Sequence, residues 1–275
     1  MSNLIVRAIT GIIVSTLFIA LTFYSPYGLM GLCVMATFVG LWEFYRLFGL
    51  AKIQYIVPTF GLVGFAWSLF LFPFPPHLLF ALAILLTPVL GALLLFDSKH
   101  KSAAESFGVY ILGITYCVIP VFVAFLIGFP EHWGEVPDLA NYNPWLPFTV
   151  CFLVGLLDTA AYFFGRYLGK RPLYERISPK KTWAGAIGGG LTCIVAGGVF
   201  DYLAVYPEVS WTVAAMIIAV VSQVGDLTES MLKRSQKIKD SGGILPGHGG
   251  MLDRLDGMYF SFPAMYLYFY IVSLL

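Results

Sequence analysis

Charged side chains are scarce in this chain of 275 residues: Asp, Glu, Lys and Arg make up 11% of it, whereas 59% of the residues are hydrophobic and 17% are aromatic. The mean hydropathy of +0.84 lies far above that of soluble globular proteins. Apolar runs close to the roughly 20 residues that cross a hydrocarbon core recur from end to end. The composition excludes an ordinary soluble domain and predicts an all-α, polytopic membrane protein.

Cysteine is also rare. The four cysteines, Cys33, Cys117, Cys151 and Cys193, lie singly inside apolar runs, and the chain has no C-x-x-C pair. Neither a zinc ribbon nor a disulfide framework is indicated, so we interpret the cysteines as small buried hydrophobes. Arg7 precedes the first apolar run as it would in a signal peptide, but no small-residue cleavage site follows. We therefore expect this run to remain as a span.

About nine apolar runs have the length of a membrane-spanning helix. Their approximate limits are 4–24, 27–48, 54–73, 78–96, 105–128, 147–168, 183–206, 210–232 and 256–275. The sequence shows no clear internal repeat and no low-complexity linker. We therefore expect one integral membrane domain, residues 1–275, in which residues 1–130 form scaffold spans and residues 146–275 form catalytic spans.

The basic residues indicate the orientation. With nine spans and a cytoplasmic N-terminus, all 16 Lys and Arg residues fall on the cytoplasmic side. The longest loop on the opposite side, residues 130–145, contains Glu131, Glu135 and Asp138 but no Lys or Arg. This partition predicts a protein of the cytoplasmic (inner) membrane with its charged loops, and any active site they form, facing the cytoplasm.

Three acidic residues in the sixth and eighth predicted spans stand out. Asp158 lies near the middle of the sixth span, and Asp226 lies in the eighth with Glu229 three residues later, on the same helix face. A carboxylate at this depth costs several kcal/mol unless it is paired or hydrated, so a functional role is the first interpretation. For Asp158 a structural pairing with Lys or Arg of another span is the alternative, and its role stays open.

The segment Ser230–Asp256, SMLKRSQKIKDSGGILPGHGGMLDRLD, concentrates charge and glycine in an otherwise apolar chain. Asp253 and Asp256 lie three residues apart where the chain re-enters a helix, so both can face one site. Hard carboxylate oxygens suit Mg²⁺, and we expect Asp226 and Asp253 to converge on such an ion across the loop. His248 fits a base, a phosphate donor or a metal ligand, and a simple loop histidine is the alternative.

A second polar cluster, ISPKKTWAG (residues 177–185), precedes the seventh span. It places Ser178, Lys180, Lys181 and Thr182 at a helix N-terminus, where hydroxyls, backbone N–H groups and positive charge favour phosphate. Lysines that only anchor the helix at the membrane surface are the alternative. The glycines of GAIGGG (residues 185–190) have small-xxx-small spacing, which indicates close helix packing in preference to phosphate contact.

These motifs resemble those of one family. The segment Ser230–Asp256 is similar throughout to the signature of the phosphatidate cytidylyltransferases, also called CDP-diacylglycerol synthases. SPKKTWAG (residues 178–185) resembles a second motif of the family, with Ala184 where many members have Glu, and GDLTES (residues 225–230) resembles a third. Residues before about 130 resemble the family only as an apolar multi-span region.

The resemblance implies the reaction CTP + phosphatidate → CDP-diacylglycerol + pyrophosphate at a membrane, a divalent cation, usually Mg²⁺, and commonly a homodimer; whether a monovalent cation assists stays open. No nucleic acid is expected as a partner. The expected catalytic residues are Asp226, Asp253, Asp256, Lys239 and His248, the expected phosphate-binding residues are Ser178, Lys180, Lys181, Thr182, Lys233, Arg234 and Arg254, and the expected metal ligands are Asp226 and Asp253.

Two other functions remain as alternatives. A CTP-dependent lipid-alcohol (polyprenol) kinase also needs CTP, a metal and a membrane acceptor, but it releases CDP instead of pyrophosphate. An ion-coupled transporter would use Asp158 and Asp226 to line an ion path. The transporter is the weaker alternative, because the charged segment lies outside the membrane on the cytoplasmic side and the sequence shows no inverted repeat.

Overall fold

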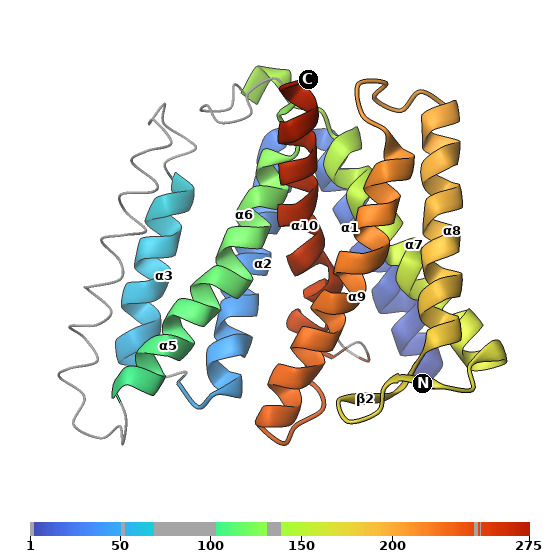
Figure 1. Cartoon of the computed structure of the whole chain (residues 1–275). Coiled ribbons are helices and arrows are strands. Elements are labelled where there is room, and N and C mark those ends of the chain that lie inside the picture. Colours follow the sequence, from blue (N-terminus) through green and yellow to red (C-terminus); the bar gives the residue numbers. More distant parts are fainter. Residues whose placement is uncertain (1–2, 51–52, 69–102, 131–138, 245–246, 248) are drawn as a thin grey trace.

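The computed structural model describes residues 3–50, 53–68, 103–130, 139–244, 247 and 249–275, most of which are helical (Figure 1). In chain order the elements are α1 (Asn3–Tyr24), α2 (Pro26–Leu47), α3 (Ile53–Ser68), α5 (Ala103–Gly113), the π-helical turn η2 (Ile114–Val118), α6 (Ile119–Leu126), the 3-10 turn η4 (Leu139–Asn141), α7 (Trp145–Leu168), β1 (Pro172–Tyr174), β2 (Ser178–Thr182), α8 (Trp183–Tyr202), α9 (Trp211–Ser235) and α10 (Leu252–Ser273).

The predicted all-α class of an integral membrane protein is confirmed, but the count of nine spans is not. In the described part of the chain five helices are long and apolar enough to cross a membrane: Pro26–Leu47, Glu105–Leu126, Trp145–Leu168, Trp183–Tyr202 and Trp211–Ser235. α10 is long enough, but its tyrosines and acidic first turns lower its hydropathy. The predicted span 78–96 lies outside the described residues.

The span Glu105–Leu126 contains a π-helical turn with a clear cause. α5, η2 and α6 follow one another without a break, and η2 ends two residues before Pro120. Proline has no N–H to donate to the carbonyl four residues earlier, and its ring pushes that carbonyl away. The helix accommodates Pro120 by widening one turn, so the chain stays helical through it.

Two hydrophobic clusters form the core, and α10 belongs to both. Leu252 and Tyr259, near the start of α10, pack in the cluster built mainly from α2, α3 and α5–α6. Phe262, Met265 and Phe269, further along α10, pack in the cluster built mainly from α7, α8 and α9. Figure 1 shows α10 (red) between α6 on one side and α9 on the other. α10 therefore packs in the hydrophobic clusters of both halves of the chain.

A short hairpin separates α7 from α8 and forms the one β-sheet in the described part of the chain. β1 and β2 pair antiparallel, with Pro172 opposite Thr182 and Tyr174 opposite Ser178. We did not predict these strands, because the segment is polar and lacks the alternating pattern of a half-buried strand. The Thr182 hydroxyl caps α8 by accepting a hydrogen bond of 3.2 Å from the Gly185 N–H. The hairpin thereby presents Ser178–Thr182 at the N-terminus of α8, as expected.

Glycines let α8 pack closely against α7. A Cβ atom added to Gly185 would lie 2.6 Å from the Ala161 carbonyl oxygen, and one added to Gly189 would lie 2.8 Å from the Leu157 carbonyl oxygen. Both carbonyls belong to α7, so backbone meets backbone along this contact. The interpretation of GAIGGG as a packing motif is confirmed, and it explains the glycines without a ligand.

This contact predicts opposite effects for two adjacent glycines. Gly189→Ala should destabilise the protein by about 1–3 kcal/mol, because its methyl group overlaps α7. Gly190→Ala should be neutral or stabilising by up to about 1 kcal/mol, because its added Cβ would find its nearest neighbour, Ala219 Cβ, at an ordinary 3.5 Å. Thermal unfolding in detergent measures both. Equal stabilities of the two variants would contradict the packing described.

Candidate active site

Four acidic side chains from three helices gather in one region of the bundle; Glu229 is buried, Asp226 and Asp256 are half-buried, and Asp158 is exposed. α7 contributes Asp158, α9 contributes Asp226 and Glu229, and α10 contributes Asp256. The carboxyl groups of Asp226 and Asp256 are within hydrogen-bonding reach of each other, and Asp158 and Glu229 lie within electrostatic range of Asp256. Two carboxyl groups in contact need a shared proton or a cation between them. The cluster is therefore a place for positive charge.

Glycines beside the two touching acids make this contact possible. A Cβ atom on Gly225 would lie 2.6 Å from the Asp256 carbonyl oxygen, and one on Gly257 would overlap the Ser222 hydroxyl. α9 and α10 therefore approach closely where each carries a Gly next to an Asp. The sequence pairs Gly-Asp on one helix and Asp-Gly on the other, and the crossing brings the two carboxyl groups together.

Two lysines supply positive charge to the site. Lys181, from β2, forms an ion pair with Asp226. Lys233, on α9, forms an ion pair with Glu229 one turn earlier and contacts Asp253 Oδ1 at 2.6 Å. Glu229 and Lys233 are both buried. Each lysine thus balances carboxylates that would otherwise stand as uncompensated charge in an apolar surrounding.

Asp253 organises the loop that precedes α10. Its carboxylate accepts hydrogen bonds from the Gly250 N–H (2.9 Å) and the Ser241 N–H (3.1 Å) in addition to that from Lys233. The residue lies at the N-terminus of α10, outside the five candidate spans. Burial raises the pKa of the Asp253 carboxyl, but these hydrogen bonds outweigh burial and lower the pKa below its ordinary value. Asp253 is therefore ionised at neutral pH.

The other predicted basic residues lie around the cluster. Arg234 donates to the Ile177 carbonyl oxygen (3.5 Å) and to the Ile238 carbonyl oxygen (3.0 Å), which ties the hairpin to the end of α9. Lys180, Lys239 and Arg254 have exposed side chains, and Ser178 is half-buried on β2. His248 lies outside the described residues. The structure thus brings Lys181 and Lys233 into contact with the acids and leaves the remaining basic side chains at the rim.

The donor set suits a hard cation, although it is not a preformed cage. Among the residues that the structure describes, no three His, Cys, Asp or Glu side chains are grouped so as to hold a metal ion. Asp226 contacts Asp256, and Asp253 contacts Lys233, so the two predicted metal ligands have different partners here. Mg²⁺ usually takes one or two carboxylates together with substrate oxygens, and such a site needs no cage of three acids.

An apolar cavity of about 560 Å³ adjoins the carboxylate cluster, bordered by α1, α2, α6, α7 and α10. Arg254 is the one charged residue among the described residues that line it. The Arg254 guanidinium also lies within electrostatic range of Asp158. The cavity is therefore mostly apolar, and its one charged lining residue, Arg254, interacts with an acid of the cluster.

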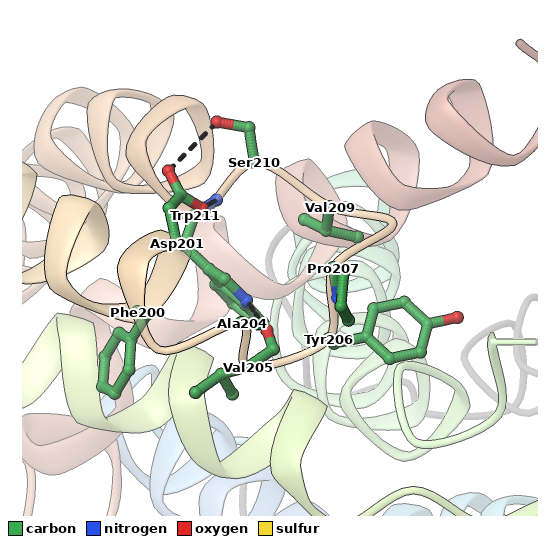
Figure 2. Close-up of a pocket in the computed structure, with 9 residues that line it drawn as sticks. All are labelled: Phe200, Asp201, Ala204, Val205, Tyr206, Pro207, Val209, Ser210 and Trp211. Atoms are coloured by element: carbon green, nitrogen blue, oxygen red, sulfur yellow. Dashed lines mark hydrogen bonds between the residues drawn. The ribbon is translucent and has the colours of Figure 1, made fainter.

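A second hollow, of about 260 Å³, lies at the opposite ends of α8 and α9 and is structural (Figure 2). Asp201 of α8 accepts hydrogen bonds there from the Thr212 N–H (3.0 Å), the Thr212 hydroxyl (2.6 Å) and the Ser210 hydroxyl (3.4 Å). These bonds use its carboxylate to cap α9. No basic residue is among the described residues that line this hollow.

Sequence analysis missed one acid at the site. Glu43 on α2 is buried, and its Oε2 accepts hydrogen bonds from the Leu252 N–H (3.0 Å) and the Ser241 hydroxyl (3.4 Å). The signal was present in the sequence, because Glu43 is an ionisable residue inside an apolar run. Glu43 lies near the end of the predicted span 27–48 and three residues before Arg46, where sequence alone does not distinguish a buried acid from one at the membrane surface.

Known proteins match nearly the whole chain. A model of the cytidylyltransferase family matches residues 5–272. A phosphatidate cytidylyltransferase of Brucella suis is 34% identical over 282 residues, covering 98% of this chain and 94% of the relative. Proteins of the same name from Bacillus subtilis and Haemophilus influenzae are each 31% identical; the matches cover 94% and 95% of this chain and 95% and 96% of the respective relatives.

The buried ion pairs predict different effects for two lysines of the same segment. Lys233→Met should destabilise the protein by about 3–5 kcal/mol, because Glu229 and Asp253 would both lose the cation that balances them. Lys237→Met changes an exposed side chain and should stay within about 0.5 kcal/mol of wild type. Denaturation in detergent measures both variants. A Lys233→Met variant as stable as Lys237→Met would show that the ion pairs add nothing.

Proposed function

The chain belongs to the cytidylyltransferase family and is therefore a nucleotidyltransferase, and from that premise we propose its reaction. It transfers CMP from CTP to phosphatidate, giving CDP-diacylglycerol and pyrophosphate in phospholipid biosynthesis. The observation that carries this proposal is the cluster of carboxylates and lysines beside an apolar cavity that Arg254 lines. That arrangement suits a substrate with an anionic head and a hydrocarbon body.

The chemistry is an in-line displacement. A phosphatidate phosphate oxygen attacks the α-phosphorus of CTP, the new P–O bond forms, and the bond from the α-phosphorus to the oxygen bridging to the β-phosphorus breaks. Pyrophosphate leaves with the bonding electrons. Such reactions depend mainly on positioning and on stabilising the charge of the phosphates. The protein groups proposed for that task are Ser178, Lys180, Lys181, Thr182, Lys233, Arg234, Lys239 and Arg254, and a role for His248 stays a prediction.

Mg²⁺ is the proposed cofactor, held by Asp226 and Asp253 with Asp256 as a third acid. Support comes from the contact between Asp226 and Asp256 and from the ion pairs of Asp226 and Asp253 with lysines, since both carboxylates already bind positive charge. When bound, Mg²⁺ supplies positive charge to the phosphate oxygens.

We also propose the orientation of the protein in the membrane. The charged loops face the cytoplasm of a bacterial-type inner membrane, where CTP is found, and the acyl chains of the substrate remain in lipid. Support comes from the distribution of Lys and Arg along the sequence. Residues 1–130 act mainly as scaffold and residues 146–275 carry the catalytic groups. A homodimer belongs to the proposal on the strength of the family resemblance alone.

One assay tests the reaction and separates it from the alternatives. Purified protein with CTP, phosphatidate and Mg²⁺ should yield CDP-diacylglycerol and pyrophosphate in equal amounts, and omission of the divalent cation should stop turnover. Release of CDP would point to a lipid-alcohol kinase. Ion flux across vesicles without consumption of CTP would point to a transporter. Either result would overturn the proposed function.

Asp253→Asn should lower turnover at least about 100-fold while leaving a folded, membrane-inserted protein. The substitution removes the negative charge that binds Lys233 and would contact the metal, but it keeps the shape of the side chain. Asp201→Asn is the control for loss of one carboxylate, because Asp201 accepts its hydrogen bonds at the far end of the bundle, away from the acids and lysines of the site. Near-normal activity of Asp253→Asn would refute its assigned role.

The apolar cavity is the proposed site for one acyl chain of phosphatidate. Its volume of about 560 Å³ lies within the range of sites for small molecules. The Arg254 guanidinium would contact the phosphate, because a guanidinium offers several donors to phosphate oxygens. A chain in the cavity and a phosphate at Arg254 would place the head group beside the carboxylate cluster.

Gly155 offers a test of this site. Gly155 lines the cavity, and a Cβ atom there would have open space, so Gly155→Phe should fill the cavity without disturbing α7. We expect a fall of about tenfold or more in kcat/KM for long-chain phosphatidate, with little change for dihexanoyl phosphatidate and in the KM for CTP. Gly31→Phe, at an open glycine of α2 outside the cavity lining, is the control. Equal losses for both chain lengths would contradict the assignment.

A further inference from the structure

Glu43 connects the N-terminal half of the chain to the active-site loop. Its side chain is fully buried on α2, and its Oε2 accepts one hydrogen bond from the Ser241 hydroxyl and one from the Leu252 N–H. These partners lie 198 and 209 residues later in the sequence. Ser241 and Leu252 flank the glycine-rich part of the loop between α9 and α10, residues 242–251. A single carboxylate therefore binds the residues on both sides of this glycine-rich part.

The Leu252 N–H is one of the first in α10, and such groups have no partner inside their own helix. The residue at the N-cap position of α10, Met251, makes no side-chain capping bond. Glu43 takes over that function from a different helix, and its carboxylate lies at the positive end of the α10 dipole. The first N–H group of α10 is thus capped by a side chain of α2.

The loop is shaped around the Glu43 carboxylate. A Cβ atom on Gly242 would overlap Glu43 Oε1 and lie 2.9 Å from its Cδ, and one on Gly250 would overlap the Ser241 hydroxyl and lie 2.5 Å from Glu43 Oε2. Neither glycine has a positive φ, so backbone conformation does not explain them. The neighbouring Gly243 has nothing within 4 Å of an added Cβ. Close approach to Glu43 is therefore the reason for glycine at position 242, and close approach to Glu43 and to its partner Ser241 is the reason at position 250.

We propose that Glu43 is a positioning residue of the active site. It contacts no reacting atom itself, but it holds the segment on which Asp253 depends, since Ser241 and Gly250 also donate their N–H groups to the Asp253 carboxylate. Glu43 on α2 and Asp253 on α10 thus bind the same segment through separate hydrogen bonds. The catalytic consequence of this role rests on the proposed cytidylyl transfer, whereas the ordering of the loop does not.

The first test compares three variants on α2. Glu43→Ala should lower kcat by about 100-fold, the cost of a small misplacement of catalytic groups, and speed hydrogen–deuterium exchange of residues 241–252. Glu43→Gln keeps an oxygen acceptor and should stay within about tenfold of wild type. Thr37→Val removes a buried hydroxyl that has no hydrogen-bond partner in the described part of the chain, and it should leave exchange of the loop unchanged.

A double-mutant cycle then tests the contact itself. Gly242→Ala should speed exchange of the loop in wild type but add nothing in the Glu43→Ala background, because the atom it meets is gone. Gly243→Ala should leave exchange of the loop unchanged in both. Additive effects of the changes at positions 43 and 242, or loss of activity in Glu43→Ala with unchanged exchange, would overturn the proposal.

The exchange measurements need no substrate, so they separate this inference from the proposed function. If wild type fails to make CDP-diacylglycerol but Glu43→Ala releases the loop, the proposed reaction is wrong and the ordering role of Glu43 stands. If wild type is active and Glu43→Ala leaves both exchange and turnover unchanged, the reaction stands and the positioning role is wrong.

Discussion

A carboxylate inside a bundle of apolar helices needs a partner for its charge, because little water is present to solvate it. This protein carries several such groups where α7, α9 and α10 meet. Lys181 balances Asp226, and Lys233 balances both Glu229 and Asp253. The hairpin that carries Lys181 and the loop that surrounds Asp253 are positioned by these pairs. The polar segments are thus positioned so that their lysines and N–H groups balance carboxylates that the apolar helices cannot stabilise.

Close backbone contact is the means by which the charges meet. Gly225 and Gly257 allow α9 and α10 to touch beside Asp226 and Asp256, and Gly189 allows α8 to touch α7. Larger residues would hold the helices apart, and the carboxyl groups would then face separate surroundings. The glycines of the helices and the acids next to them therefore act together.

The helical fold was predictable from sequence, and several contacts of the candidate site were not. Hydrophobic length predicts helices well, and Asp226 and Asp253 stood out as acids beside apolar runs. The hairpin at Ser178–Thr182 escaped prediction because polar residues without a period carry no strand signal. The partners of Asp253 and the role of Glu43 depend on contacts between distant segments, which local patterns do not encode. Nor does hydropathy alone identify α10 as a shared core helix.

The separation between Glu43 and its partners has a consequence for biogenesis. A membrane protein is synthesised from its N-terminus, so α2 exists before the loop at Ser241–Leu252 leaves the ribosome. α10 therefore finds its cap already in place when it is made. A chain cut short before α10 would leave the Glu43 carboxylate buried without the N–H donor that it accepts from at Leu252. Synthesis of α10 is thus coupled to the burial of a carboxylate on α2.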